Sequence, residues 1–298
     1  MPHALFLGAG FSAWAADLPV AARLFDFAIQ IDGPREQRKL TFVREIKNNW
    51  DEENPKGLAE QFVAFALNLP AAQKESILWY ITRRLSEPFI SREYAWRRYR
   101  RHVLMIDENR RFEIRGVIRA RNFLQPFCGV DLVGIVNTNY DLLIEYALGT
   151  GVFNYGERGQ RLVGRGAYPL AERRNPITLT GSIPVAKIHG SYSWDREAFY
   201  TDGRCGIRGR ALIVAPTAEK APPASLRHVW ELAKAVLRTA TDLVVFGFAF
   251  NPYDEAVLNL LRECRDLKRV RLINRAPLID RANAIWPHAD ITLEGPPN

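Results

Sequence analysis

The sequence is poor in cysteine, and the few cysteines it has stand far apart. Its 298 residues include only Cys128, Cys205 and Cys264, and no two of them form a C-x-x-C pair. Three separated thiols can build neither a disulfide framework nor a zinc site with four thiolates. The five histidines, which also lack the spacing of metal ligands, are His3, His102, His189, His228 and His288. We therefore expect reduced, mostly buried thiols and no bound metal.

Long apolar runs are also absent. No segment approaches the roughly 20 apolar residues that a membrane-spanning helix needs. The N-terminus lacks the basic region of a signal peptide, and Gly8 and Gly10 interrupt its apolar run. We therefore expect a cytoplasmic protein without a membrane segment. The net charge of +8, from 41 basic and 33 acidic residues, permits an anionic ligand or partner without identifying one.

Short apolar strands alternate with helical segments over much of the chain. Strands are predicted at 3–8, 130–136, 185–188, 211–214, 242–246 and 270–273. One helix is predicted over 13–31 and a second one ends at residue 148. Two more are predicted over about 226–240 and about 254–265. Residues 151–182 are expected to form a loop or irregular hairpin. This alternation indicates βαβ units. The expected fold class is α/β, a Rossmann-like parallel sheet with helices on both faces.

Residues 33–125 show a different pattern, because apolar residues recur there at helical spacing between prolines. Leu58, Phe62, Phe65 and Leu69 illustrate it. We predict a core formed by residues 1–32 and 126–298 and an all-helical insert at 33–125. None of the polar clusters that end the predicted strands lies in this insert. We therefore expect it to form an assembly or partner surface instead of the catalytic crevice.

Arginine is dense toward the end of the insert. These arginines are Arg92, Arg97, Arg98, Arg100, Arg101, Arg110, Arg111, Arg115, Arg119 and Arg121. Acidic residues lie among or just before them, which favours a solvated helical face, with nucleic-acid binding through Arg92–Arg121 as the alternative. Aromatic residues near arginines are typical of protein interfaces. Those in the insert are Trp79, Tyr80, Tyr94, Trp96 and Tyr99.

Small or polar clusters follow the predicted strands. The clusters are Gly8-Ala9-Gly10-Phe11-Ser12, Asn137-Thr138-Asn139-Tyr140-Asp141, His189-Gly190-Ser191, the stretch GFAFNPYD that begins at Gly247, and Ile273-Asn274. Ligands of open α/β sheets bind beyond the carboxyl ends of the strands. We therefore expect these clusters to face one crevice.

The first cluster matches the pattern G-x-G-x-x-G/A between a strand and a helix, with Gly8, Gly10 and Ala13 at the fixed positions. Such a turn lets a diphosphate approach the helix N-terminus, and a tight turn without a ligand is the alternative. The usual acidic residue at the end of a second strand is missing, because Asp26 and Asp32 lie in a stretch predicted to be helical.

Two further clusters carry side chains suited to catalysis. Helix capping needs one polar residue, whereas Asn137, Asn139 and Asp141 supply two amides and a carboxylate before a predicted helix. His189 stands at a strand end beside a glycine, where a structural and a catalytic role are both open.

The ordered set of clusters resembles the sirtuin family. The resemblance covers about residues 1–32 and 130–275 and is closest to the sirtuin-like NAD hydrolases of bacterial antiphage defence. Sirtuin deacetylases have a four-cysteine zinc module, which this chain cannot form. They also have a P-D-F-R stretch, where this chain reads Asp17-Leu18-Pro19-Val20-Ala21-Ala22. Both departures argue against acyl-lysine chemistry.

The resemblance implies an NAD glycohydrolase, with NAD as substrate and nicotinamide and ADP-ribose, or a cyclic form, as products. It implies that Asn139 positions water or a ribose hydroxyl, Asp141 holds the nicotinamide carboxamide, and His189 contacts the ribose and acts as general base. The residues implied to contact NAD are Gly8, Ala9, Gly10, Phe11 and Ser12 near the phosphates, Thr138 and Tyr140, and Gly247 and Asn274 on the adenosine side.

Two other functions are compatible with the same motifs. One is an ADP-ribosyl transferase or deacylase acting on protein, which the scarcity of cysteine disfavours. The other is a non-catalytic subunit that senses NAD or ADP-ribose, which the Asn139 and His189 pair disfavours. We expect no fused sensor domain after the core, so restraint of an NAD hydrolase would come from a homo-oligomer or a separate protein. By analogy with defence systems, that protein is an ATPase or nuclease.

We predict that the purified protein contains no stoichiometric zinc and needs no added metal, because its thiols and imidazoles lack ligand spacing. Elemental analysis of the folded protein checks this. One zinc per chain, lost together with the fold on chelation, would contradict it.

Overall fold

The computed structural model describes residues 1–31, 33–89, 115–149, 151–156, 161–165, 174–179, 181–195, 199–200, 206, 208–215 and 224–297. Within these residues, no helix is long and apolar enough to cross a bilayer.

Seven strands form a parallel sheet at the centre of the molecule, in the order β12-β11-β10-β1-β2-β6-β3. They are β1 (His3–Leu7), β2 (Leu132–Asn137), β3 (Phe153–Asn154), β6 (Ile183–Lys187), β10 (Asp242–Phe246), β11 (Arg269–Ile273) and β12 (Asp290–Glu294). The central strands are buried on both faces, which is why they are continuous apolar runs in the sequence. The predicted α/β fold with a Rossmann-like sheet is confirmed.

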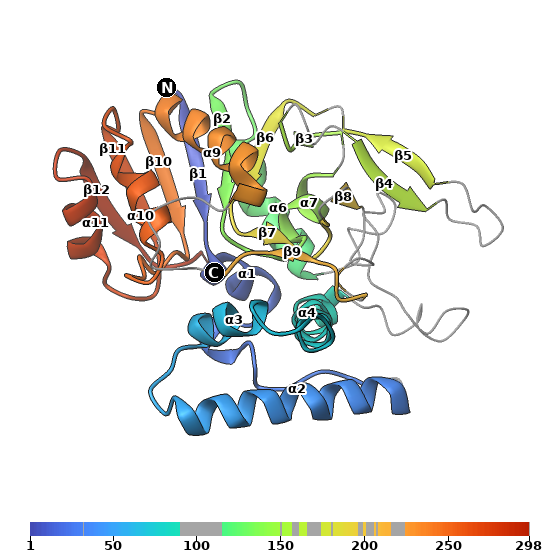
Figure 1. The fold of residues 1–298 in the computed structure, drawn as a ribbon. Coiled ribbons are helices and arrows are strands. Elements are labelled where there is room, and N and C mark those ends of the chain that lie inside the picture. Colours follow the sequence, from blue (N-terminus) through green and yellow to red (C-terminus); the bar gives the residue numbers. More distant parts are fainter. Residues whose placement is uncertain are drawn as a thin grey trace.

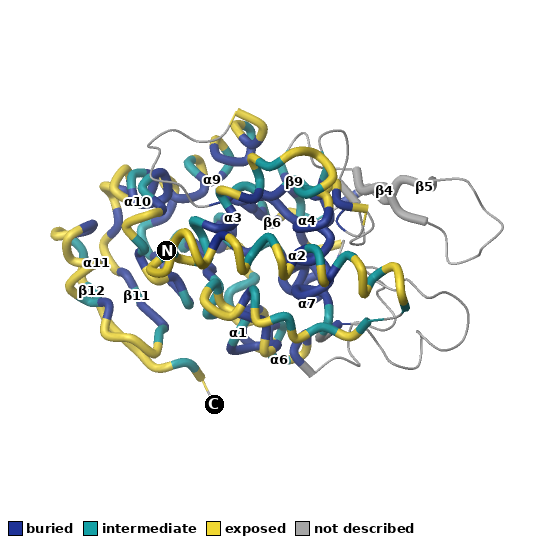
Figure 2. Tube along the Cα trace, turned by 60° about the horizontal axis from the view of Figure 1, so that its bottom comes forward, coloured by how far each residue is buried: buried dark blue, intermediate teal, exposed yellow. Residues whose placement is uncertain are grey.

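Helices cover both faces of this sheet (Figure 2). On one face, α9 (Arg227–Thr239) packs against β1, β2 and β6, and α10 (Glu255–Arg262) lies beside it. On the other face, α6 (Arg115–Leu124) packs against α1 (Ala9–Ala16) and α7 (Leu143–Leu148). The short α11 (Ile279–Ile285) contacts α10 and β12.

The chain leaves the adjacent strands β1 and β10 in opposite directions. From β1 it continues to β2 and β6, whereas from β10 it continues to β11 and β12 on the other side of the sheet. A crevice opens at the carboxyl ends of two such strands, and ligands of open α/β sheets bind there. The fold therefore places the predicted strand-end clusters around one point.

Backbone atoms come into close contact at this point. Gly247, directly after β10, has a φ of 68°, a conformation that favours glycine. A Cβ atom at Gly247 would lie 2.3 Å from the main-chain nitrogen of Phe11. Cβ atoms at Gly8 and Gly10 would lie 2.6 and 2.7 Å from backbone atoms of Gly247. Glycine is therefore required on both sides of this contact.

A layer of three helices lies across the carboxyl edge of the sheet (Figure 1). It consists of α2 (Pro34–Glu53), α3 (Ala59–Leu67) and α4 (Ala71–Ser86). Its aromatic core joins Phe62 to Phe25 and Trp50, with ring centroids 4.7 and 5.4 Å apart. The described part of residues 33–125 is thus helical, and its last helix, α6, packs on α1 and α7.

Two of the aromatic residues proposed for a partner surface are core residues instead. Trp79 and Tyr80 of α4 are buried within the chain. The Tyr80 hydroxyl donates a hydrogen bond to the main-chain oxygen of Leu24 at 2.9 Å, so it fixes the segment after α1. Tyr94, Trp96 and Tyr99 lie outside the described residues, and so do the arginines from Arg92 to Arg111.

The predicted helix over 13–31 is wrong in its second half. Helix α1 ends at Ala16 because Asp17 adopts a left-handed φ of 54° and its N–H bonds to the Ala13 oxygen, and Pro19 follows soon after. Residues 17–31 form a loop with one short 3-10 turn, Ala21–Arg23. The spacing of apolar residues that suggested a helix arises because this loop packs against the helical layer.

Strand β12 was not predicted, because it is a mostly exposed edge strand with little apolar patterning. The predicted strand at 211–214 does not join the main sheet, since β9 (Leu212–Ile213) pairs only with β7 (Gly190–Ser191). The expected irregular hairpin exists as β4 (Arg161–Arg165) paired with β5 (Arg174–Thr178), with β8 (Phe199–Tyr200) alongside β4.

We predict that Gly247→Ala lowers the free energy of unfolding by roughly 2–5 kcal/mol. About 1–2 kcal/mol comes from the left-handed conformation and about 1–3 kcal/mol from overpacking. Denaturant titration measures the change. The control is Gly129→Ala, since Gly129 is exposed and an added Cβ would meet no atom within 4 Å. Equal stability of the two variants would contradict the prediction.

Candidate functional site

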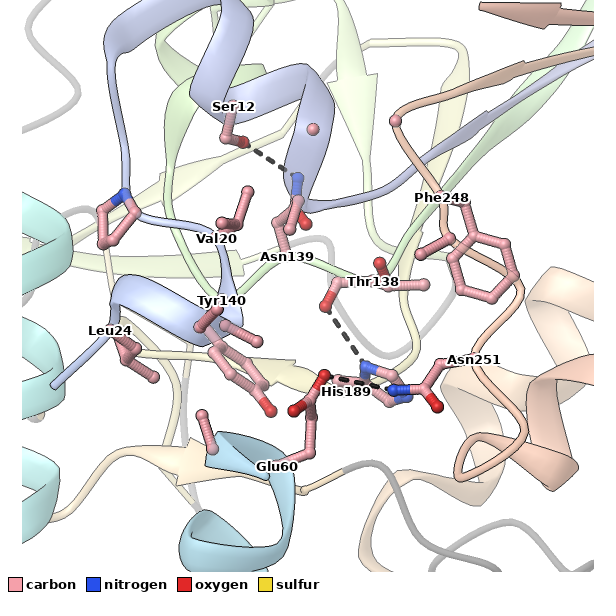
Figure 3. A pocket seen from close by; sticks show the side chains of 18 of the residues that line it. Ser12, Val20, Leu24, Glu60, Thr138, Asn139, Tyr140, His189, Phe248 and Asn251 are labelled. Atoms are coloured by element: carbon pink, nitrogen blue, oxygen red, sulfur yellow. Dashed lines mark hydrogen bonds between the residues drawn. The ribbon is translucent and has the colours of Figure 1, made fainter. Parts of the chain in front are cut away.

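A cavity of about 420 Å³ lies at the carboxyl ends of the central strands, within the usual range of about 300–1,000 Å³ for small-molecule pockets (Figure 3). Clusters after β1, β2, β6, β10 and β11 line it on the sheet side. The loop after α1 and helices α3 and α4 line it on the other side. The lining residues are Ala9, Gly10, Ser12, Pro19, Val20, Ala21, Ala22, Leu24, Ala59, Glu60, Val63, Leu85, Thr138, Asn139, Tyr140, Asp141, His189, Gly247, Phe248, Ala249, Asn251, Asp254 and Asn274.

The structure brings most of the predicted site residues to this cavity. Those that line it are Ala9, Gly10, Ser12, Thr138, Asn139, Tyr140, Asp141, His189, Gly247 and Asn274. Two predicted site residues, Gly8 and Phe11, do not line the cavity. Gly8 packs against the backbone of Gly247. The Phe11 ring is buried against Trp14, Phe123 and Phe246, so its side chain belongs to the core.

The N-terminus of α1 forms one wall of the cavity. Gly8 is the N-cap residue and supplies no side-chain cap, and Ala9, Gly10 and Ser12 of the first turn line the cavity. The N–H of Gly10 donates to the Gly247 oxygen at 2.9 Å and therefore holds the turn. The positive end of the helix dipole favours a negative charge in this part of the cavity.

Asn139 is fixed by three hydrogen bonds. Its Nδ2 donates to the Gly8 oxygen and to the Ser12 hydroxyl, both at 2.9 Å, and its main-chain N–H donates to Oδ1 of Asn137 at 3.0 Å. Both protons of the amide are used in this way. The side chain can therefore contact a ligand only through Oδ1, as a hydrogen-bond acceptor.

Buried charges lie under the loop that carries Asp141. The Lys187 ammonium donates to the main-chain oxygen of Asp141 and to Oε1 of Glu145, the latter at 2.9 Å. Lys187 and Glu145 are both fully buried. Because this lysine holds the Asp141 main chain, it orients the whole segment from Asn139 to Asp141.

The Asp141 carboxylate accepts the Leu143 N–H at 2.9 Å and a hydrogen bond from Ser12. Burial raises the pKa of Asp141 even though Lys187 and these hydrogen bonds act in the opposite direction. A buried carboxylate of this kind is suited to accept hydrogen bonds from an amide NH₂ group.

His189 is held at both ring nitrogens. Its Nδ1 lies 3.2 Å from the main-chain oxygen of Thr138, which can only accept, so Nδ1 carries a proton (Figure 3). Its Nε2 lies 3.3 Å from the carboxylate of Asp254. In a neutral His189, Nε2 is thus the ring nitrogen without a proton.

Tyr140 and Asn274 have anchoring contacts. The Tyr140 hydroxyl donates to the Val214 oxygen at 3.0 Å, and burial, together with the nearby Asp254 and Glu60 carboxylates, raises the pKa of this phenol. The Asn274 amide donates to the Phe248 oxygen at 3.1 Å, which fixes the loop after β10.

The helical layer contributes to the cavity, contrary to the expectation that it would lie apart from the crevice. Glu60 of α3 accepts a hydrogen bond from Nδ2 of Asn251 at 3.2 Å (Figure 3), and Val63 and Leu85 line the apolar side. Sequence reasoning missed Glu60 because it resembles any charged helix residue. It also missed Asp254. Asp254 is the last residue of the GFAFNPYD cluster, and its place in a cluster that follows a strand could have identified it as a site residue.

We predict that Asp141→Asn is more stable than the wild type at pH 7, and that the difference shrinks as the pH falls toward 4. Because burial raises the folded-state pKa above 3.8, the wild type loses stability as the pH rises from there through the raised value. The neutral amide of the variant avoids this loss. Thermal melting of both proteins across pH measures the difference in their stability.

Asp242→Asn is the matched control with the opposite sign. The hydrogen bond from Arg269 lowers the pKa of Asp242, so this substitution should slightly destabilise the protein at pH 7, because the Arg269 partner is exposed and solvent weakens the pair. If Asp141→Asn lowered the melting temperature at every pH, the assignment of a buried, unfavourably charged carboxylate would be wrong.

No family model matches the chain, and no curated protein matches it. Similar solved structures include a Sir2 homologue in complex with NAD, which is 16% identical, with 98% of this chain and 82% of that chain covered and a TM-score of 0.38. A substituted Sir2 homologue in complex with ADP-ribose is also 16% identical, with 98% and 85% covered and a TM-score of 0.39. A structure of a Sir2 enzyme is 13% identical, with 97% and 86% covered and a TM-score of 0.37. These similarities are too weak to assign this chain to a family or an activity.

Proposed function

We propose that this protein binds NAD in the cavity and cleaves its nicotinamide–ribose bond, as an NAD glycohydrolase that depletes NAD in antiphage defence. One observation carries the enzymatic part. Asn139, Asp141 and His189, which come from two different strand ends, converge on a cavity that is also lined by the N-terminus of helix α1. A carboxylate, an amide acceptor and an imidazole thus face a place where a dinucleotide diphosphate can bind.

Main-chain groups rather than basic side chains would hold the diphosphate. No lysine or arginine is among the described residues that line the cavity. The N–H groups of Gly10 and Phe11 already donate to Gly247 and Gly8, so the first turn of α1 would act mainly through its dipole, and the glycines of this turn let a phosphate approach closely. This arrangement fixes the diphosphate at α1 and directs the nicotinamide ribose toward Asn139 and His189.

The proposed reaction consumes one water molecule. The bond between the ribose carbon and the nicotinamide nitrogen breaks, and nicotinamide leaves as a neutral molecule with the electron pair of that bond. Water then forms a bond to the positively charged ribose carbon and loses a proton. NAD⁺ and water therefore give nicotinamide, ADP-ribose and one proton, and a nucleophile within the ADP-ribose would give a cyclic product instead.

Each of the three side chains has a task that its geometry supports. Asp141 accepts hydrogen bonds from the nicotinamide carboxamide. Asn139 presents Oδ1 to the attacking water or to a ribose hydroxyl, because its NH₂ group is used elsewhere. His189 takes up the proton through Nε2, since Nδ1 already donates to Thr138. Histidine suits this role because its unperturbed pKa lies near neutrality.

We predict that the wild type consumes NAD without any acceptor protein, and that His189→Ala and Asn139→Ala each lower turnover at least 100-fold, within the range of about 10²–10⁴ for general acid–base catalysis. Nicotinamide release measured by chromatography checks this. Asn139→Ala removes a donor from Gly8 and Ser12 and should also cost about 1–3 kcal/mol of stability, so turnover is compared where both proteins are folded.

The matched controls are His288→Ala and Asn283→Ala, at exposed positions of the same residue types. Both should keep wild-type turnover. A wild type that leaves NAD intact, or a His189→Ala variant with normal melting and normal turnover, would refute the proposed function.

A further inference from the structure

Asp254 occupies a helix-capping position without capping the helix. It is the N-cap residue of α10, and its side chain makes no hydrogen bond to the first turn of that helix. Aspartate at an N-cap usually accepts such a bond. The side chain is instead buried, with 4% of the residue exposed, and it lines the cavity. A buried carboxylate is unfavourable unless it has a partner, so the capping position does not explain this residue.

The partner of Asp254 is His189. Its Oδ1 and Oδ2 both lie 3.3 Å from Nε2 of the imidazole. The two side chains are 6% and 5% exposed, so solvent screens this contact weakly. They come from different elements, since His189 follows β6 and Asp254 precedes α10. The fold therefore brings them together at the rim of the cavity.

The other ring nitrogen determines what this contact can do. Because Nδ1 donates its proton to the Thr138 oxygen, a neutral His189 has its lone pair on Nε2, next to Asp254. When Nε2 accepts a proton, the resulting N–H can donate to the carboxylate, and the positive ring lies beside a negative group. A carboxylate placed in this way orients an imidazole and stabilises its protonated form.

Other charged or titratable groups near His189 do not replace Asp254 in this contact. Glu60 of α3 is occupied with Asn251, and the Tyr140 hydroxyl donates to Val214. Asp141 bonds to Leu143 and faces the buried Lys187. Among the described residues, Asp254 supplies the carboxylate that lies within hydrogen-bond distance of the His189 imidazole.

We propose that Asp254 is a positioning residue that acts through His189. Its carboxylate lies beside Nε2, limits the orientation of the ring and stabilises the imidazolium formed when His189 takes the proton of the attacking water. In that step an O–H bond of water breaks, the bond from its oxygen to the ribose carbon forms, and the proton passes to Nε2. This inference rests on the proposed cleavage of NAD.

Asp254→Asn separates this role from helix capping. Asparagine caps helices about as well as aspartate and has nearly the same shape, but it carries no charge. The matched control is Glu255→Gln, because Glu255 is the next residue, lies in the first turn of α10 and bonds to Arg262 rather than to His189. Neither substitution should change the melting temperature by more than a few degrees.

The kinetic test is the rate of nicotinamide release as a function of NAD concentration and pH. Asp254→Asn should lower kcat at least 30-fold while KM for NAD changes less than about threefold, within the scale of general-base effects. The pH of half-maximal rate should move to lower pH, since protonation of the ring loses its favourable partner. Glu255→Gln should behave as the wild type. An unchanged kcat or an unchanged pH profile in Asp254→Asn would overturn the inference.

A second measurement does not depend on activity. The ring nitrogens of ¹⁵N-labelled histidines are recorded by NMR in the ligand-free protein, with the His189 signals assigned from their loss in His189→Gln. The Nε2 signal of His189 should shift in Asp254→Asn and stay in place in Glu255→Gln. Unchanged ring signals in Asp254→Asn would overturn the inference even if NAD is cleaved, whereas failure of the proposed function would appear as absence of cleavage by the wild type.

Discussion

Backbone contact between the turn after β1 and the turn after β10 is the constraint on which the site depends. Glycine at positions 8, 10 and 247 lets main-chain atoms approach at distances that any side chain would prevent. The contact places the N-terminus of α1 against the loop after β10, and Asn139 is tied to the same turn through the Gly8 oxygen. Three strand ends are therefore positioned by one set of main-chain contacts, and the cavity forms where they meet.

The cavity is lined by carboxylates, whereas the buried lysine close to Asp141 lies outside its lining. Lys187 is buried behind the loop that carries Asp141, bonded to Glu145 and to the Asp141 main chain. The cavity itself is lined by Glu60, Asp141 and Asp254, no lysine or arginine is among its described lining residues, and the positive end of the α1 dipole faces it.

The order of motifs along the chain was sufficient to predict the α/β sheet and many of the residues that line the cavity. Apolar runs at His3–Leu7, Leu132–Asn137 and Asp242–Phe246 could be recognised because strands buried on both faces are continuously apolar. Since the carboxyl ends of parallel strands share one edge, Asn139, Asp141 and His189 could be expected to meet there. Local pattern and the geometry of parallel sheets settle these points without long-range information. The predicted helix over 13–31 failed because its apolar spacing reflects packing on another element.

Contacts between segments far apart in the sequence decided the rest. Glu60 reaches the cavity only because α3 lies across the carboxyl edge of the sheet, and a charged residue on a helix gives no sign of that placement. Phe11 lies within the glycine motif, yet the direction of the first turn of α1 sends its ring into the core. Asp254 is 65 residues from His189, and its side chain could be assigned to helix capping until both positions were known. The sequence by itself determined the kinds of groups at the strand ends, because these are local properties. The tertiary structure decided which of them touch, because those contacts depend on how the helical layer and the loop after β10 pack against the sheet.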